Sequence, residues 1–393
     1  MKEQQSKNKK VGERWSESKS EITPHVQPIF QTSVYDYPDL ESLDDYYNGR
    51  IPGGYIYSRN GLPNSNALGS RVASFEQMEK GLVCSSGMSA LLVSTLSYLG
   101  KGDRITASND LYGGTSVLLK DELTRFGIET TFVDASSPDI EIEGGTKLVL
   151  VETISNPTMK VCDLKTISKL AHDRGSLLVV DNTFATPFVV RPAELGADIV
   201  MHSGTKFLGG HGDVTIGLLC GRSKEMQRAA QFNTRVGTIA GPFDCWLALR
   251  SLATWEIRVK KSCENAIKLA RFLEDRKDKV SRVFYPGLDS HPQHRLASRI
   301  FSRGMYGGML SFDLRGGLGA ASRFVKSLEK ITLTPSLGGV NTTISHPGKT
   351  SHRHISEQQK RESGITDAMI RVSVGTEDYA LIEEEFERAL GKA

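Results

Sequence analysis

Short apolar runs rich in β-branched residues alternate with helical patterns over the first half of the chain. Such runs are typical of buried strands, and their alternation with helices predicts a sheet covered on both faces. The expected strands lie near residues 82–84, 104–108, 128–134, 147–152, 176–180, 197–201 and 214–220. Helical spacing of apolar residues is found between several of them, at 66–78, 88–96 and 163–174.

The pattern changes after about residue 223, where it becomes helical and then mixed. We expect a bridging helix over 242–259, followed by helices at 260–277 and 318–328, strands at 282–284, 309–313 and 368–374, and a final acidic helix. This order is typical of a smaller α+β domain. The predicted organisation is an N-terminal arm over 1–60, a large domain over 61–258 and a C-terminal domain over 259–393.

Composition narrows the class of protein. The chain has 393 residues, 24% of them charged and 38% hydrophobic, as in soluble globular proteins. A formal net charge of +3, dispersed along the sequence, gives no reason to expect a nucleic-acid partner. No apolar run reaches membrane-spanning length, so no membrane partner is expected. Residues 1–20 are polar and lack the apolar core of a secretory signal, and we expect a flexible arm there.

The five cysteines (Cys84, Cys162, Cys220, Cys245 and Cys263) are scattered, odd in number and never spaced as C-x-x-C. This argues against a disulfide framework and against a zinc site, and we expect no metal. It also suits a reducing compartment, so a cytoplasmic location is predicted.

Two charged residues occupy the ends of two expected strands. Asp181 follows Leu177–Val180, and Lys206 comes soon after Ala197–Met201. Ligands of α/β sheets bind outside the carboxyl ends of the strands, and a buried acid or amine needs a partner. Pyridoxal phosphate requires such a pair, because it attaches to a lysine and needs an acid against its pyridinium nitrogen. The hydroxyls of Ser203 and Thr205 are close enough in sequence to bind its phosphate.

Other segments offer groups for an anion. Ser85-Ser86-Gly87-Met88 links a strand to a helix, where free backbone N–H groups favour a phosphate, although simple capping by serine is an alternative. Tyr57 and Arg59 place a phenol and a guanidinium on one extended segment, which is also compatible with an ordinary edge strand. Arg371 lies inside an apolar strand and needs an anion, either a ligand or an internal carboxylate. The nucleotide fingerprints G-x-x-x-x-G-K-[ST] and G-x-G-x-x-G are missing from the sequence.

The motifs D-N-T at 181–183 and S-G-T-K at 203–206 resemble the signature of the Cys/Met-metabolism family of pyridoxal-phosphate enzymes, and the likeness extends from about Ile29 to Leu390. The resemblance implies an α/β protein of fold type I, like aspartate aminotransferase. Its large mixed sheet is covered on both faces, and a smaller α+β domain follows. It also implies pyridoxal 5'-phosphate as the cofactor and a small amino acid as the substrate. The expected assembly is a homo-oligomer, a dimer of dimers with shared active sites.

The resemblance also assigns roles to individual residues. Tyr112 is expected to stack on the cofactor ring and to move a proton, Asn156 to bind the ring's 3′ oxygen, and Gly87 and Met88 to hold the phosphate through their backbone N–H groups. Tyr57 and Arg59 are expected to reach the phosphate in the neighbouring subunit. Arg371 is assigned the substrate carboxylate. The full expected set is Lys206, Tyr112 and Asp181 for catalysis; Tyr57, Arg59, Gly87, Met88, Asn156, Thr183, Ser203 and Thr205 for the cofactor; and Arg371, Ser336, Asn156 and Tyr57 for the substrate.

The family chemistry implies γ-elimination on a sulfur-type amino acid, with γ-replacement as the alternative and a non-catalytic pyridoxal-phosphate-binding protein as a third. Two positions depart from the family's marked patterns. Pro335 stands where cystathionine-type enzymes usually carry Glu, and Gly114 stands where bacterial methionine γ-lyases carry Cys. Proline offers neither charge nor donor, so we expect cystathionine not to be the best substrate.

Overall fold

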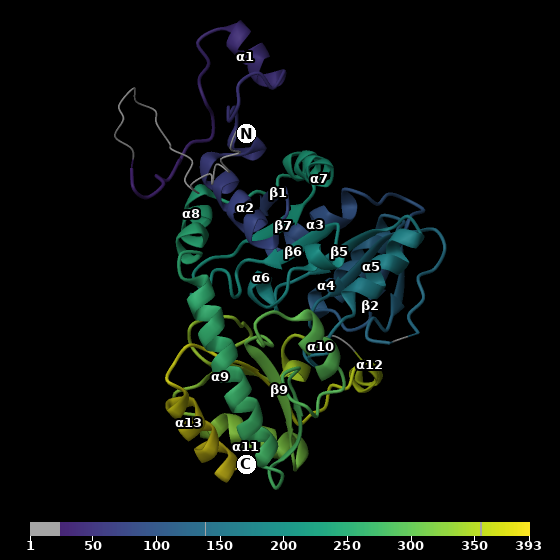
Figure 1. Cartoon of the computed structure of the whole chain (residues 1–393), viewed down its shortest axis with the longest axis vertical. Helices are drawn as coiled ribbons and strands as arrows, with labels where there is room; N and C mark the ends of the chain where they lie inside the picture. The colour runs from purple at the N-terminus through teal and green to yellow at the C-terminus, as the bar shows by residue number, and fades with distance from the viewer. Residues whose placement is uncertain (1–23, 138, 354–355) are drawn as a thin grey trace, which may run out of the picture.

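The computed structural model describes residues 24–137, 139–353 and 356–393, which fold around two β-sheets (Figure 1). The predicted flexible arm at residues 1–20 lies outside the described residues. The larger sheet occupies the upper half of the view and the smaller sheet the lower half, with α9 running along one side of the lower half (Figure 1). The expected α/β class, with a second and smaller C-terminal part, is confirmed.

The larger sheet is mixed, with the strand order β1-β7-β6-β5-β4-β2-β3. Its strands are β1 (Lys80–Cys84), β2 (Arg104–Ser108), β3 (Glu129–Val133), β4 (Thr146–Glu152), β5 (Leu177–Asp181), β6 (Ile199–Ser203) and β7 (Gly217–Gly221). β7 runs antiparallel to both of its neighbours, whereas β6, β5, β4, β2 and β3 run parallel to one another. All seven strands lie within a few residues of their predicted positions.

Both faces of this sheet are buried, which explains the nearly continuous apolar runs. In β4, Leu148 and Leu150 belong to the core on one face, whereas Val149 and Val151 belong to the core on the other. The surrounding helices are α2 (Pro63–Glu76), α3 (Gly87–Leu96), α4 (Gly113–Val117) with a π-helical continuation (Leu118–Leu123), α5 (Leu164–Asp173), α6 (Thr186–Val189) and α7 (Ser223–Val236). The sheet is thus fixed in the protein interior, with its polar strand ends at one edge.

The chain passes from the larger to the smaller sheet through α8 (Pro242–Ser251) and α9 (Trp255–Asp275). The sequence placed the junction of these helices near residue 259, but it falls at residues 252–254. Trp255 is buried, and its ring lies 4.9 Å from that of Phe75 and 6.4 Å from that of Phe188, so the first turn of α9 is packed against the larger half. The expected boundary between residues 258 and 259 lies inside α9 and stays a prediction.

The smaller sheet has the order β10-β11-β12-β9-β8. Its strands are β8 (Val280–Phe284), β9 (Met309–Leu314), β10 (Thr332–Leu333), β11 (Thr343–Ser345) and β12 (Met369–Ser373), and its helices are α10 (His294–Ile300), α11 (Gly317–Ser327), α12 (Glu357–Glu362) and α13 (Tyr379–Gly391). Ile370 and Val372 pack into a core with residues of α9, α11 and α13. Arg371, between them, therefore points to the opposite face of the sheet.

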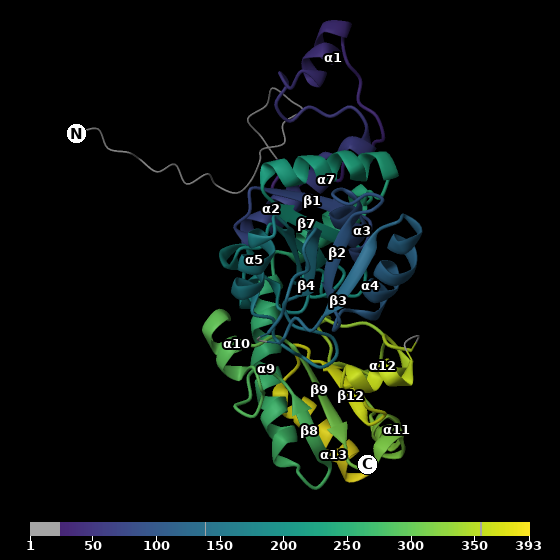
Figure 2. The same ribbon diagram turned by 90° about the vertical axis from the view of Figure 1, so that its right-hand side faces the viewer.

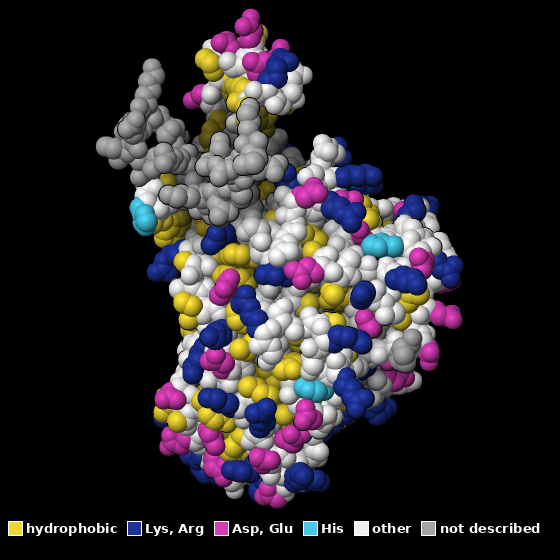
Figure 3. All heavy atoms as spheres, viewed as in Figure 1, with side chains coloured by type: hydrophobic (Ala, Val, Ile, Leu, Met, Phe, Trp, Pro, Cys, Tyr) yellow, Lys and Arg dark blue, Asp and Glu magenta, His cyan; other side chains and the backbone are white. Residues whose placement is uncertain are grey.

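The segment before α2 projects from the body of the molecule (Figure 2). It carries α1 (Leu40–Tyr47), capped by the Asp39 carboxylate, which accepts a bond of 2.7 Å from the Ser42 N–H. The sequence showed little periodicity here and α1 was not predicted. A helix of eight residues with no buried side chain has no apolar face for a pattern to reveal. Figure 3 shows hydrophobic side chains at the surface of this projection, and its exposed apolar residues include Val34, Leu40, Tyr47 and Ile51. None of the described helices combines the length and apolar character that crossing a membrane requires.

Candidate active site

A cavity of about 580 Å³ lies between the two sheets. The larger half contributes the ends of β4, β5 and β6 and the start of α3, and the smaller half contributes β12 and two loops. Its lining includes most of the residues expected from the sequence, namely Gly87, Met88, Tyr112, Asn156, Asp181, Thr183, Ser203, Thr205, Lys206, Pro335 and Arg371. Residues far apart in the chain are thereby brought to one site.

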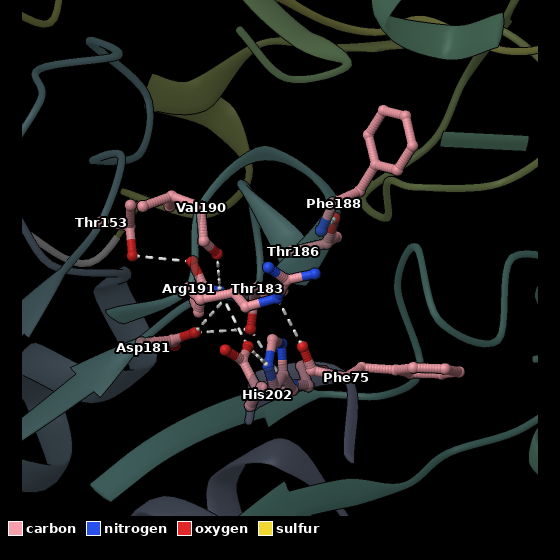
Figure 4. A network of polar contacts seen from close by, with 12 residues as sticks. Phe75, Thr153, Asp181, Thr183, Thr186, Phe188, Val190, Arg191 and His202 are labelled. Carbon is pink, nitrogen blue, oxygen red and sulfur yellow. Dashed lines mark hydrogen bonds and ion pairs between the residues drawn. The ribbon is translucent and has the colours of Figure 1, made fainter. Parts of the chain in front are cut away.

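Asp181 ends β5 at the cavity, and its carboxylate is oriented by Thr183 (Figure 4). Its Oδ1 accepts bonds from the backbone N–H of Thr183 at 2.9 Å and from the Thr183 hydroxyl at 2.5 Å. Burial raises the pKa of Asp181, while the two bonds from Thr183 and the nearby His202 act in the opposite direction. A cation placed against this carboxylate would keep it ionised.

A buried polar network lies close to Asp181 (Figure 4), and the charge of its His202 lowers the pKa of Asp181. His202 Nε2 lies 2.6 Å from Glu76 Oε1, and the same oxygen accepts a bond of 2.9 Å from the Asn182 side chain. Thr153 donates to the Asn182 side chain at 2.9 Å. Neither Glu76 nor His202 was expected from the sequence, because their spacing of 126 residues gives no local signal.

Glu152 is a second carboxyl beside Asp181 that the sequence did not single out. It ends β4, and the two residues are paired in register across β4 and β5. Its Oε1 accepts a bond of 2.6 Å from the backbone N–H of Tyr112. Burial, followed by the charge of Asp181, raises the pKa of Glu152 well above its usual value. Burial thus disfavours the charged form of Glu152, and its hydrogen bond fixes the position of the Tyr112 backbone.

Lys206 lies in the tight turn after β6, which is closed by a bond of 2.7 Å from the Gly210 N–H to the Lys206 carbonyl. Its Nζ donates to the Ser336 hydroxyl at 3.1 Å, across the gap between the two halves. Burial, and then the charge of Arg371, lower the pKa of Lys206. Lys206 forms no ion pair with any described residue, so its amine faces the cavity without a carboxylate to hold it charged.

The start of α3 forms one end of the cavity. Ser86 caps this helix by accepting a bond of 3.0 Å from the Ser89 N–H, which leaves the N–H groups of Gly87 and Met88 outside the cap bond. A Cβ at Gly87 would lie 2.9 Å from Cβ of Ser203, so only glycine allows the two segments to approach this closely. Capping and anion binding are therefore both possible at this helix terminus, as the sequence left open.

Tyr112 lines the cavity with a partly exposed ring, at 43% of its full accessible area. The space beside the ring is limited at Gly114, where a Cβ would lie 2.6 Å from Cε1 of Tyr112. Gly114, where the chain departs from the family pattern, therefore lies directly beside the Tyr112 ring. A larger residue at 114 would require the ring to move.

Arg371 is buried, with 3% of its area exposed, and its Nη1 donates to Asn156 Oδ1 at 2.9 Å. Burial lowers the pKa of Arg371 to about 10, so it stays charged at neutral pH. The sequence left open whether an internal carboxylate neutralises it. Within the described parts of the chain no ion pair to Arg371 is found, so a ligand carboxylate is the remaining source of an anion.

Tyr57 and Arg59 lie away from this cavity. They belong to the exposed segment at the helical turn Ser58–Asn60, where Arg59 donates to the Thr234 carbonyl at 3.1 Å and its guanidinium lies 5.4 Å from the Tyr57 ring centre. The further lining residues that were not expected from the sequence include Lys349, Thr350, Ser351 and Arg353. They come from an irregular loop after β11, for which periodicity gives no signal.

The residues present fit pyridoxal phosphate. The cavity combines a buried carboxylate, an amine of lowered pKa, and a helix start with its glycine pressed against Ser203. Those three features match the needs of a pyridinium nitrogen, a covalently attached aldehyde and a phosphate. No group of three or more metal-ligating side chains is found among the described residues.

Comparison with known proteins agrees with this fit. The family model for Cys/Met metabolism PLP-dependent enzymes matches residues 11–391. An L-methionine gamma-lyase from Fusobacterium nucleatum subsp. polymorphum is 39% identical over 375 residues, covering 93% of each chain. An O-succinylhomoserine sulfhydrylase from Pseudomonas aeruginosa is 36% identical over 369 residues, covering 93% of this chain and 91% of the relative.

A solved structure of a related enzyme is also similar to this chain over nearly its whole length. A putative O-acetylhomoserine (thiol)-lyase from Campylobacter jejuni, which contains N'-pyridoxyl-lysine-5'-monophosphate, superimposes with a TM-score of 0.88 at 29% identity. The match covers 93% of this chain and 95% of that one.

Proposed function

We propose that this chain, which belongs to the family of Cys/Met metabolism PLP-dependent enzymes, catalyses γ-elimination on an amino acid with a sulfur-type or related γ substituent. The observation that carries the proposal is the meeting of Lys206 and Asp181, from neighbouring strand ends, with Arg371 from the opposite sheet in one cavity. The products would be a keto acid, ammonia and the released γ substituent.

The cofactor would be held by groups from three segments. Lys206 would attach it covalently, Asp181 would pair with its ring nitrogen, and Gly87 and Met88 would bind its phosphate through their N–H groups. The hydroxyls of Ser203, Thr205 and Thr183 line the same cavity, Asn156 would contact the ring's 3′ oxygen, and Tyr112 would stack on the ring. When bound, pyridoxal phosphate supplies an electron sink that makes the substrate's Cα–H acidic.

The chain's own residues would position the substrate and move its protons. Arg371 would bind the α-carboxylate, and Ser336, which contacts Lys206 Nζ, would help to orient the substrate. The lowered pKa of Lys206 makes its uncharged amine easier to form than that of an ordinary lysine, so Nζ can act as the general base for the α proton. Tyr112, held through its backbone by Glu152, is placed to carry a second proton.

A γ-replacement reaction is the alternative, in which a thiol adds to the same substrate. It is favoured by the likeness to an O-succinylhomoserine sulfhydrylase. A non-catalytic pyridoxal-phosphate-binding protein is a third reading, and the presence of a Lys206 amine, an Asp181 carboxylate and an unpaired Arg371 in one cavity counts against it.

Assembly and location are part of the proposal. Tyr57 and Arg59 lie on an exposed segment outside their own cavity, so we assign them to the neighbouring subunit's phosphate in a homo-oligomer, a dimer of dimers. All five cysteines are free and buried, which suits the reducing conditions of the cytoplasm.

The test is steady-state release of keto acid and ammonia from methionine, homocysteine, cystathionine and O-acylhomoserines. The expected result is turnover of at least one of them by a yellow protein, with turnover lost in Lys206→Ala while the thermal unfolding midpoint stays close to that of the parent. Near-normal turnover in Lys206→Ala would overturn the proposal. Keto acid formed only when no thiol is present, with a thioether product when one is added, would favour γ-replacement.

A further inference from the structure

An arginine from the first turn of α9 holds the turn after β6. Arg258 Nη1 donates to the Phe207 carbonyl at 2.9 Å, and its Nη2 donates to the Leu208 carbonyl at 3.0 Å. Its other bonds go to the corner between α8 and α9, where they reach the Ser251 carbonyl at 3.0 Å and the Thr254 hydroxyl at 3.2 Å. One guanidinium thus joins the bridging helices to this turn.

These bonds satisfy carbonyls that the turn itself leaves open. The turn is closed by its own backbone, because the Gly209 N–H donates to the Gly204 carbonyl at 2.8 Å and the Gly210 N–H donates to the Lys206 carbonyl at 2.7 Å. The two carbonyls that follow Lys206 take part in neither bond, and a buried carbonyl needs a donor. Arg258 supplies a donor to each, and its planar fork is suited to two neighbouring acceptors.

Close packing leaves Arg258 little freedom. Gly210 has a φ of +73°, and a Cβ there would lie 1.8 Å from Arg258 Nη1. Within the described residues no carboxylate pairs with Arg258, and burial lowers its pKa to about 10, so it stays charged at neutral pH. The charge is therefore directed at backbone oxygens, with no acid to draw the guanidinium away from them.

A loop of the smaller half contacts the same turn. The Val340 N–H donates to the Gly210 carbonyl at 3.0 Å, and a Cβ at Gly338 would lie 2.6 Å from the backbone N of the residue after Lys206. The backbone of the turn is thus held by this loop and by Arg258, and the Lys206 side chain extends from it into the cavity.

We propose that Arg258 is a positioning residue for Lys206, which fixes the place of Nζ in the cavity by holding the two carbonyls that follow. The inference rests on the proposed function, in which Nζ must reach both the cofactor aldehyde and the α proton of the substrate. A reacting group misplaced by about 1 Å can lose about a hundredfold in rate. Because Arg258 does not line the cavity, its loss should slow the steps that use Nζ and leave substrate binding nearly unchanged.

Arg258→Lys tests the proposal with the positive charge retained. An ammonium cannot hold both carbonyls as a fork does, so kcat for the substrate that the keto acid assay identifies should fall about tenfold while KM stays within about twofold. Release of pyridoxal phosphate from the holoenzyme, followed by loss of its yellow absorbance, should become faster, because a misplaced amine holds the aldehyde less well. Arg271→Lys, at an exposed position of α9, is the matched control and should behave as the parent.

Two glycines provide a second test in which Arg258 itself is unchanged. Gly210→Ala would displace Arg258, whereas Gly212→Ala imposes similar left-handed strain, at a φ of +70°, with no atom within 4 Å of the new Cβ. Only Gly210→Ala should lower kcat, by about tenfold, and speed cofactor release. Adding it to Arg258→Lys should cause little further loss, because both changes break the same contact.

Equal kcat and release rates in Gly210→Ala and Gly212→Ala would overturn the inference. A lower thermal unfolding midpoint in Arg258→Lys, with parental kcat and cofactor release, would also overturn it, and so would failure of both Arg258→Lys and Gly210→Ala to fold. In each case Arg258 would serve stability alone, and an inactive Lys206→Ala would leave the proposed function intact. Near-normal turnover in Lys206→Ala would instead overturn both.

Discussion

Glu152 and Asp181 are direct neighbours across β4 and β5, and burial raises the pKa of both, but different neighbours oppose that effect. Asp181 accepts two bonds from Thr183, and these oppose the effect of burial on its pKa. Glu152 accepts one bond from the Tyr112 backbone, and its pKa is raised well above the usual value by burial and by Asp181 itself. Asp181 therefore has more hydrogen bonds that favour its charged form than Glu152 has, and it is the better partner for a cation.

Replacing each carboxyl with its isosteric amide should therefore affect kcat strongly at one position and little at the other. Asp181→Asn should lower kcat by at least about a hundredfold, because a neutral amide cannot stabilise the ring nitrogen's proton. Glu152→Gln should stay within about threefold of the parent, because the amide oxygen still accepts from the Tyr112 N–H and the raised pKa of Glu152 already disfavours a charge there. Steady-state kinetics together with the absorbance of bound cofactor measure both. An unchanged rate in Asp181→Asn would make that residue structural.

Sharing of sites between subunits can be tested by mixing two inactive variants. Arg59→Ala should lose activity through weaker phosphate binding in the neighbouring subunit, and Lys206→Ala should lose it within its own cavity. A hybrid dimer then contains one intact site, so mixed chains should recover part of the parent activity, up to about a quarter under random exchange.

The control for that experiment is each variant refolded alone, which should stay inactive. Exchange of subunits is confirmed separately with tagged chains. If exchange occurs and activity does not return, Tyr57 and Arg59 serve their own chain, for example through the Thr234 contact of Arg59.

Two buried histidines should make stability depend on pH. Burial is the first cause that lowers the pKa of both His291 and His352 to about 4. An unfolded histidine titrates near 6.5, so between about pH 6.5 and 4 the unfolded chain binds more protons than the folded one. Each histidine thus lowers the free energy of unfolding by about 1.4 kcal/mol per pH unit as the pH falls through this window.

Buried carboxyls of raised pKa, such as Glu152, act in the opposite direction, so the difference between variants is the quantity to measure. Between pH 7 and pH 5 the thermal unfolding midpoint of His291→Gln should fall by less than that of the parent. His25→Gln, at an exposed position, should follow the parent curve. Equal slopes in all three proteins would show that His291 is protonated when folded.

The sequence predicted the strands of the larger sheet, because these depend on local patterns, and most of the residues that patterns or the family resemblance singled out line the cavity. β5 and β6 are apolar runs that end in Asp181 and at the turn before Lys206, so the pattern that predicts the strands also places the two residues. The buried polar network beside Asp181 could not be predicted from the sequence. Glu76 and His202 are 126 positions apart and meet only because α2 packs near the sheet.

The position of the irregular loop after β11 could not be predicted for another reason. Lys349 and Arg353 sit in an irregular segment with no period of two or 3.6 residues, and as single basic residues they resemble any solvated charge. Their position at the cavity follows from contacts such as that of Ser351 with Gly113, which depend on how the two halves pack. The short helix α1 was missed because it has no buried face.

Cystathionine should not be the best substrate, and Pro335 provides the reason. This residue lines the cavity and offers neither charge nor donor to the distal ammonium of cystathionine, where related enzymes are expected to carry a carboxylate. Losing one charged hydrogen bond weakens recognition by about 1.5–3 kcal/mol. The kcat/KM for cystathionine should therefore fall below that for homocysteine, methionine or an O-acylhomoserine by about tenfold or more.

Pro335→Glu tests this explanation against its neutral counterpart, Pro335→Gln. The glutamate should raise kcat/KM for cystathionine by about tenfold relative to the best acylhomoserine, because it supplies the missing partner for the ammonium. The glutamine, which changes the backbone in the same way but carries no charge, should raise it far less. A clear preference of the parent enzyme for cystathionine, together with little effect of Pro335→Glu, would show that another group binds the distal end and that Pro335 does not determine specificity.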